Sequence, residues 1–229
     1  MAKRDYKYLW NPGMLLHYFL FTIATWGICS QPGQNKKPLD IKDSYSAFSD
    51  VIYRNKVDSM LPAVKTGDIL LRSGTGADSY LVAMMNVKDK TYSHCGIVII
   101  EDGYPFVYHC IGGEDNPDAR MRRDSLVNYL APGHTLGFGL VRYDLDSIHI
   151  CSVKQQVYKY YAAKTKFDLK FDLKSDDQLY CSELVYKVIN KAMKDTEYIK
   201  LTHAFGHTFV SLDNLFINPH AHFICKVQY

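Results

Sequence analysis

The stretch SHCGIVIIEDGYPFVYHC, residues 93–110, decides the fold, because two runs of β-branched and aromatic residues flank Asp102-Gly103. An Asp-Gly pair between such runs is the strongest short-range signal of a two-residue β-hairpin. With Asp102 and Gly103 as the two loop residues, cross-strand partners are residues whose numbers sum to 205. The sequence therefore predicts two antiparallel strands, at His94–Glu101 and Tyr104–Ile111.

The predicted register places two histidines on one face of the hairpin. His109 lies opposite Gly96, and because side chains alternate between the faces, His94 and His109 are diagonal neighbours about 7–8 Å apart at the backbone. Imidazole rings can bridge that gap, although a structural accident explains the spacing equally well. The same register puts Cys95 opposite Cys110 on the other face. There, buried free thiols are favoured over a cross-strand disulfide.

Cys181 begins the cleanest helical pattern of the chain, CSELVYKVINKAM at 181–193. A thiol at a helix N-terminus lies near the positive end of the dipole and near unpaired backbone N–H groups, which lower its pKa. The adjacent backbone N–H can also donate to an oxyanion. Cys181 is therefore a candidate nucleophile, and a merely buried first-turn residue is the alternative.

Weaker patterns surround these segments. They predict helices at 43–61, 79–85 and 146–166, strands at 67–72 and 136–143, and a last, edge strand at 222–227. Helices that flank a small, mostly antiparallel sheet define an α+β domain. We expect this domain to span residues 43–229.

The N-terminal segment has a different composition from the rest. A basic start precedes an apolar stretch at 14–29, an order typical of secretory signals, and sixteen apolar residues are few for a membrane span of about 20. We expect residues 1–27 to be a signal peptide cleaved after Gly27, or else an uncleaved anchor or a buried helix. Residues 28–42 then form a tether, and lipidation at Cys29 is an alternative. The protein is expected to be exported to the periplasm or cell envelope.

Composition excludes several classes of protein. With 47% hydrophobic and 22% charged residues the chain is not disordered, and six cysteines are too few for a disulfide scaffold. The net charge of +3 falls to +1 without residues 1–27, which gives no reason to expect nucleic acid as a partner. Contact with a membrane is expected only through the N-terminal segment, and the oligomeric state stays open.

Five motifs occur in an order that resembles a known family. They are GDILLRSG (67–74), SHCGIVI (93–99), FVYHC (106–110), RRDSLVNYL (122–130) and DLKSDDQLYCSELVYKVI (172–189). Together they resemble the YiiX/YebB-like branch of the NlpC/P60 superfamily, whose members are circularly permuted papain-like cysteine hydrolases. The resemblance spans roughly residues 60–190 and implies that fold, a small antiparallel sheet or half-barrel packed against helices.

The resemblance also implies roles for individual residues. Matched by motif, Cys181 is the nucleophile, His94 the general base and His109 the third, orienting residue, at a position that is often glutamate in the family. The reaction implied is cleavage of an amide or ester through a thioacyl-enzyme, without metal or cofactor. The backbone N–H of Cys181, and the hydroxyl of Tyr180, are candidate oxyanion donors or groove residues.

Two other interpretations and the substrate remain open. One is a catalytically inactive binding module on the same fold. The other is a zinc site of His94, Cys95, His109 and Cys110, which tetrahedral coordination disfavours because adjacent ligands point to opposite faces. A cell-wall peptide, an N-acyl amino acid and a lipid-like amide or ester all fit the implied chemistry.

Overall fold

The computed structural model describes residues 41–113, 116–204 and 206–228. The expected signal peptide or anchor, and all of the tether except residues 41 and 42, lie outside the described residues. Within those described, no helix has both the length and the apolar character needed to cross a membrane.

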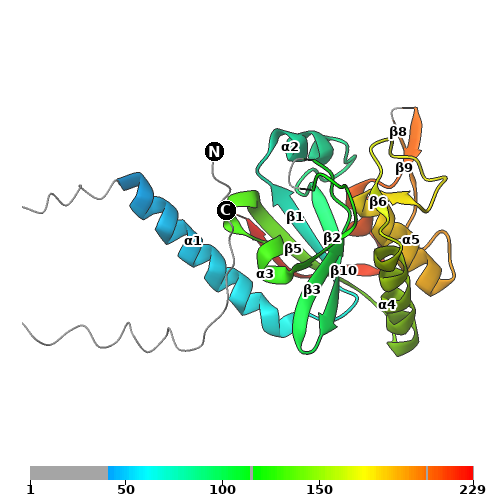
Figure 1. Cartoon of the computed structure of the whole chain (residues 1–229), viewed down its shortest axis with the longest axis horizontal. Helices are drawn as coiled ribbons and strands as arrows, with labels where there is room; N and C mark the ends of the chain where they lie inside the picture. The colour runs from blue at the N-terminus through cyan, green and yellow to red at the C-terminus, as the bar shows by residue number, and fades with distance from the viewer. Residues whose placement is uncertain (1–40, 114–115, 205, 229) are drawn as a thin grey trace, which may run out of the picture. The chain divides into compact units, whose positions relative to one another are not determined.

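A six-stranded antiparallel sheet forms the centre of the domain, in the order β10-β5-β1-β2-β3-β4 (Figure 1). The strands are β1 (Ile69–Gly74), β2 (His94–Glu101), β3 (Tyr104–His109), β4 (Arg122–Ser125), β5 (Thr135–Tyr143) and β10 (Ala221–Gln228). The sheet has two ends and is not closed into a barrel. The α+β class and the small antiparallel sheet are confirmed, and the last strand lies at an edge, as predicted.

Helices and short strand pairs complete the domain. The helices are α1 (Ile41–Met60), α2 (Ala77–Met84), α3 (Leu126–Tyr129), α4 (Ser147–Ala162) and α5 (Cys181–Met193), with 3₁₀ turns η2 (Leu61–Ala63), η3 (Pro132–His134) and η4 (Leu212–Leu215). The strands β6 (Lys166–Phe167) and β7 (Gln178–Leu179) pair in parallel, and β8 (Thr202–Ala204) pairs with β9 (His207–Phe209) antiparallel. The sequence predicted neither β4 nor these short pairs.

The two faces of the sheet are covered by different helices. Alternate residues such as Ile69, Cys95 and Ile97 pack with α4 and α5 in one hydrophobic cluster. The intervening residues, such as Leu70 and Val98, pack with α1 and α3 in a second cluster. Figure 1 shows α4 and α5 on one side of the sheet and α1 on the other.

The predicted hairpin register is confirmed along β2 and β3. Every paired residue, from Glu101 with Tyr104 to Ile97 with Tyr108, obeys the sum of 205. Asp102 and Gly103 both have positive φ, 49° and 83°, as a type I′ turn requires. Beyond Ile97 and Tyr108 the two strands are no longer paired.

Gly96 makes room for the histidine pair. A Cβ atom at Gly96 would lie 2.5 Å from Cγ1 of Val107 and 3.0 Å from Cβ of His109. Both distances are below ordinary van der Waals contact. A side chain at Gly96 would therefore push His109 away from its place on the sheet.

We predict that Gly96→Ala destabilises the domain by about 1–3 kcal/mol, the usual cost of overpacking a well-packed interior. Urea unfolding followed by circular dichroism measures this change. Gly133→Ala is the matched control, because a Cβ atom there meets no atom within 4 Å and we expect a change below about 1 kcal/mol. Equal midpoints for the two variants would show that Gly96 is not sterically required.

Candidate active site

A chain of hydrogen-bonded side chains runs across three neighbouring strands. Nε2 of His94 on β2 lies 2.9 Å from Nδ1 of His109 on β3. Nε2 of His109 lies 3.0 Å from Oδ2 of Asp124 on β4, and Nη2 of Arg122 donates to Oδ1 of Asp124 at 2.9 Å. The predicted proximity of the two histidines is confirmed, and the chain continues to a carboxylate that the sequence did not single out.

The carboxylate fixes the proton positions along this chain. A carboxylate only accepts, so Nε2 of His109 carries the proton that bonds to Asp124. Nδ1 of His109 is then a bare acceptor, and Nε2 of His94 must donate to it. The remaining nitrogen of His94, Nδ1, therefore carries a lone pair. That lone pair is available to accept a proton.

Burial keeps both imidazoles neutral. It lowers the pKa of His94 well below its ordinary value, and the charges of His109 and Arg72 lower it further. Burial also lowers the pKa of His109, although the hydrogen bond and charge of Asp124 oppose it. Burial raises the pKa of Asp124, but His109 and Arg122 outweigh it and leave the pKa below its ordinary value. At neutral pH, Asp124 therefore carries the negative charge of this hydrogen-bonded group of side chains.

Tyr129 of α3 holds the two imidazoles in place. Its ring stacks on His94, with centroids 5.7 Å apart, and meets His109 edge-on at 4.9 Å. The guanidinium of Arg72 lies 4.8 Å from the centre of the Tyr129 ring and donates to the Tyr129 carbonyl at 2.8 Å. The imidazoles therefore sit in a fixed aromatic environment, which a proton-transfer group needs.

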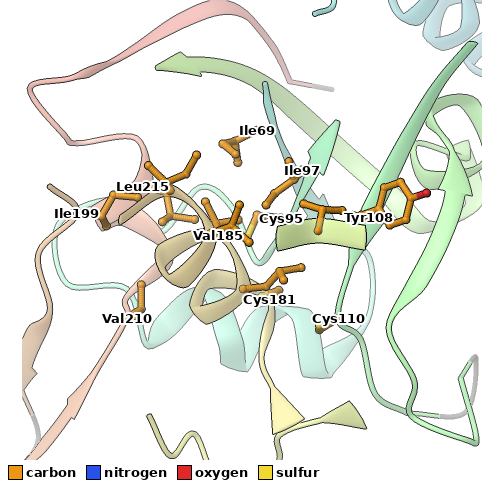
Figure 2. Close-up of a cluster of buried hydrophobic side chains, with 14 of the residues drawn as sticks. Ile69, Cys95, Ile97, Tyr108, Cys110, Cys181, Val185, Ile199, Val210 and Leu215 are labelled. Carbon is orange, nitrogen blue, oxygen red and sulfur yellow. The ribbon is translucent and has the colours of Figure 1, made fainter. Parts of the chain in front are cut away.

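Cys181 is the first residue of α5, as the sequence predicted, and is only 7% exposed. Figure 2 shows it in the same buried cluster as Cys95 and Cys110. The pKa of Cys181 lies below its ordinary value because the Cys95 side chain and the backbone N–H groups of Cys95, Ser182 and Cys181 donate to the sulfur, against the opposing effect of burial. The largest of these effects comes from the Cys95 side chain, and the backbone N–H groups at the helix start add to it.

Cys95 lies between the Cys181 thiol and the hydrogen-bonded histidines: it contributes to the pKa of Cys181 and directly follows His94 in β2. The ladder between β2 and β3 ends at Ile97, two residues from Cys95, and both the thiol and the backbone N–H of Cys95 lower the pKa of the Cys181 thiol. Its neighbour His94 points to the opposite face, into the hydrogen-bonded chain. Among the described residues, no hydrogen bond joins the His94 ring directly to the Cys181 sulfur.

The two thiols of the hairpin, Cys95 and Cys110, are free and buried. Cys95 and Cys110 are fully buried and unbridged, as the sequence favoured. Burial raises the pKa of both thiols well above the ordinary value, and the proximity of Cys181 adds to this. Cys95 therefore stays protonated and acts as a donor to Cys181.

Tyr180 caps α5, and its phenol lies in the interior. The hydroxyl accepts a hydrogen bond of 2.8 Å from the backbone N–H of Val210, while the ring lines a groove beside Cys181. The Tyr180 N–H donates to the buried carboxyl of Glu183, whose pKa burial raises to about 7 despite the nearby Lys187. Both contacts fix the start of the helix.

The residues of the site do not fit a metal ion. The two imidazoles bond each other, and both cysteines of the hairpin lie in the cluster on the other face of the sheet. Within the described ranges, no three His, Cys, Asp or Glu side chains are grouped so that they could hold a metal.

Comparison with known proteins relates the chain to an Escherichia coli protein. The uncharacterized protein YiiX of Escherichia coli strain K12 is 29% identical over 132 residues, which are 56% of this chain and 59% of YiiX. The crystal structure of metalloprotein yiiX from Escherichia coli O157:H7 matches with a TM-score of 0.58. The chain is similar to YiiX. That structural match, at 21% identity, covers 71% of this chain and 97% of yiiX, and it shows a shared fold alone. No family model matches the sequence.

The sequence could not identify Asp124 as part of the site. Asp124 lies opposite Val107 and is therefore diagonal to His109, but this register depends on how β4 returns to β3 after a connection of twelve residues. The motif RRDSLVNYL marked the segment without indicating its partner.

We predict that Cys95→Ala raises the pH at which Cys181 becomes reactive. The variant removes a thiol donor that stabilises the thiolate, and such a bond to a charged group corresponds to a shift of about one pH unit. Iodoacetamide labelling of Cys181 at several pH values, resolved by peptide mass spectrometry, measures the midpoint. Cys95→Ser keeps a donor and should keep the midpoint low, and the exposed Cys151 is the internal reference. An unshifted midpoint in Cys95→Ala would contradict the donor role.

Proposed function

We propose that the protein is a cysteine hydrolase that cleaves an amide or ester bond through a thioacyl-enzyme, as the motifs imply. Cys181 is the nucleophile, His94 the general base and His109 the residue that orients it. The observation that carries the proposal is the hydrogen-bonded chain from Asp124 through both histidines, which leaves the lone pair of His94 Nδ1 free. His94 directly precedes Cys95, whose backbone N–H and thiol lower the pKa of Cys181.

The steps follow from these proton positions. The Cys181 thiol gives its proton to Nδ1 of His94, and the sulfur attacks the carbonyl carbon. The leaving amine or alcohol takes that proton as the carbon–nitrogen or carbon–oxygen bond breaks. Water then gives a proton to His94 and attacks the thioester carbon. The carbon–sulfur bond breaks, the acid leaves, and His94 returns its proton to the sulfur of Cys181. The backbone N–H of Cys181 supports the oxyanion.

Fold and location belong to the same proposal. The order of the sheet and the thiol at the start of α5 are consistent with a permuted papain-like arrangement, in which the histidine strand precedes the cysteine helix along the chain. The apolar segment at 14–29 supports action in the periplasm or cell envelope. The substrate is a cell-wall peptide, an N-acyl amino acid or a lipid-like molecule.

One observation favours an inactive binding module on the same fold. Cys181 is nearly buried, and its sulfur bonds to Cys95 rather than to the His94 ring. Turnover distinguishes the two functions. All three substrate classes are incubated with the wild type and with Cys181→Ala, and products are identified by mass spectrometry. Product formed only by the wild type supports the hydrolase, and none from any class supports the binding module.

We predict that Asp124→Asn lowers kcat by roughly 10²–10⁴-fold, the usual contribution of acid–base catalysis. Asp124 accepts from both His109 and Arg122, whereas an amide has one acceptor oxygen and can satisfy only one of them. The proton positions of the histidine chain are then lost. Asp118→Asn, at an exposed carboxylate paired with Arg120, is the matched control and should leave kcat unchanged. A kcat in Asp124→Asn equal to that of the control would refute the proton chain.

A further inference from the structure

A polar depression lies beside β4, the edge strand that carries Asp124. Water can enter about 490 Å³ of it, a volume within the range of small-molecule sites. Its walls come from the segment before β4, from β4 itself and from the end of α4. Four of its ten lining residues carry a positive charge: Arg120, Arg122, Arg123 and Lys164. The depression is therefore suited to a polar ligand.

Two cations face each other across a short strand pairing beside this depression. Arg120 lies directly opposite Lys166 in an antiparallel bridge, and both side chains are exposed. The Met121 N–H bonds the Thr165 carbonyl next to this bridge, which makes Arg120 and Lys166 a non-hydrogen-bonded pair, the kind whose side chains lie closest together. Like charges directly opposite each other destabilise a strand pairing. An anion bound between the two side chains would remove this repulsion.

The carboxylates around the depression do not balance its cations. Each described carboxylate there is already paired with an arginine: Asp118 with Arg120, Asp124 with Arg122 and Glu101 with Arg123. Among the described residues, neither Lys164 nor Lys166 forms an ion pair, and both are exposed. The two lysines therefore give this place a surplus of two positive charges.

The edge of the sheet adds a backbone donor. Because β4 is the last strand, alternate N–H groups along this segment face away from β3. The Met121 N–H is one of them, since it bonds Thr165, and the next in the alternation belongs to Arg123. Arg123 lines the depression. An anion there therefore meets an outward-facing backbone N–H as well as cationic side chains.

We propose that this depression binds the phosphate group of a small organic phosphate, held by Lys164, Lys166 and Arg120. A phosphate monoester carries close to two negative charges at neutral pH and three acceptor oxygens, which match the two surplus positive charges and the several donors. Tyr161 and Ala162, at the end of α4, also line the depression and offer apolar contact to the organic part.

The inference goes beyond the proposed hydrolase and does not depend on it. Phosphate binding at Lys164 and Lys166 requires no reaction at Cys181, so either proposal can fail while the other stands. A long polyanion is not favoured as the ligand, because the chain beyond residue 27 has a net charge of only +1.

Binding provides the first test. Isothermal titration calorimetry of the full chain at low ionic strength compares inorganic phosphate, glycerol 1-phosphate and adenosine monophosphate, and the last two distinguish a sugar-like from a nucleotide source of the phosphate. We expect at least one organic phosphate to bind at least threefold more tightly than inorganic phosphate, because it also contacts Tyr161 and Ala162. Absent binding of all three probes, or tighter binding of citrate, overturns the phosphate site.

Paired variants test whether the cations form a specific site. Arg120→Ala/Lys166→Ala removes the opposed pair and should raise the Kd at least tenfold, since hydrogen bonds to charged groups are the strong ones. Lys191→Ala/Lys200→Ala removes two exposed lysines that do not line the depression, and should leave the Kd within about twofold of the wild type. Thermal unfolding by circular dichroism verifies that both variants are folded. Equal weakening in the two variants would reveal a general attraction between charges and overturn the site.

Protection of individual lysines locates the ligand on the wild type. Acetylation by sulfosuccinimidyl acetate is followed by peptide mass spectrometry with and without saturating glycerol 1-phosphate. We expect modification of Lys164 and Lys166 to slow at least threefold and that of Lys191 and Lys200 to stay unchanged. Unprotected Lys164 and Lys166 in the presence of bound ligand would place the ligand elsewhere and overturn the proposal. An RNA hexamer that binds more tightly than either organic phosphate would overturn the choice of a small ligand.

Discussion

The turn at Asp102-Gly103 is the constraint on which the site depends. Asp102 and Gly103 both have positive φ and form a two-residue loop. As a result, the residue numbers of every cross-strand pair in β2 and β3 sum to 205. A shift of one residue would exchange the faces of one strand relative to the other. His94 and His109 would then be separated by the sheet.

The register also explains how a histidine and a thiol from opposite layers can serve one site. β2 and β3 stop pairing beyond Ile97, and the thiol and N–H of Cys95, on the unpaired part of β2, lower the pKa of Cys181 at the start of α5. The adjacent His94 belongs to the other face and reaches Asp124 through His109. A single residue of β2 therefore connects the helix layer with the proton chain.

Local patterns predicted the parts of the site that local geometry determines. Asp102-Gly103 set the hairpin and the proximity of His94 and His109, and helical periodicity placed Cys181 at the first residue of α5. Contacts between distant segments could not be predicted in this way. The position of Asp124 beside His109 depends on how β4 pairs with β3. The groove beside Cys181 is lined by four segments that only the tertiary fold brings together.

The electrostatics of the site differ at its two ends, and this difference constrains the mechanism. Burial disfavours an imidazolium at His94, whereas the donors from Cys95 and the helix terminus favour a thiolate at Cys181. A stable thiolate–imidazolium pair at rest is therefore not expected, and in the proposed mechanism the Cys181 proton moves to His94 only as the sulfur attacks. When His94 accepts a proton, its charge can be balanced by Asp124 only through His109, because the carboxylate lies one imidazole further away. The second histidine thus holds the carboxylate at a distance from His94 and makes a positive charge on His94 transient, which suits the proposed role of His94 as a group that returns its proton to the leaving group.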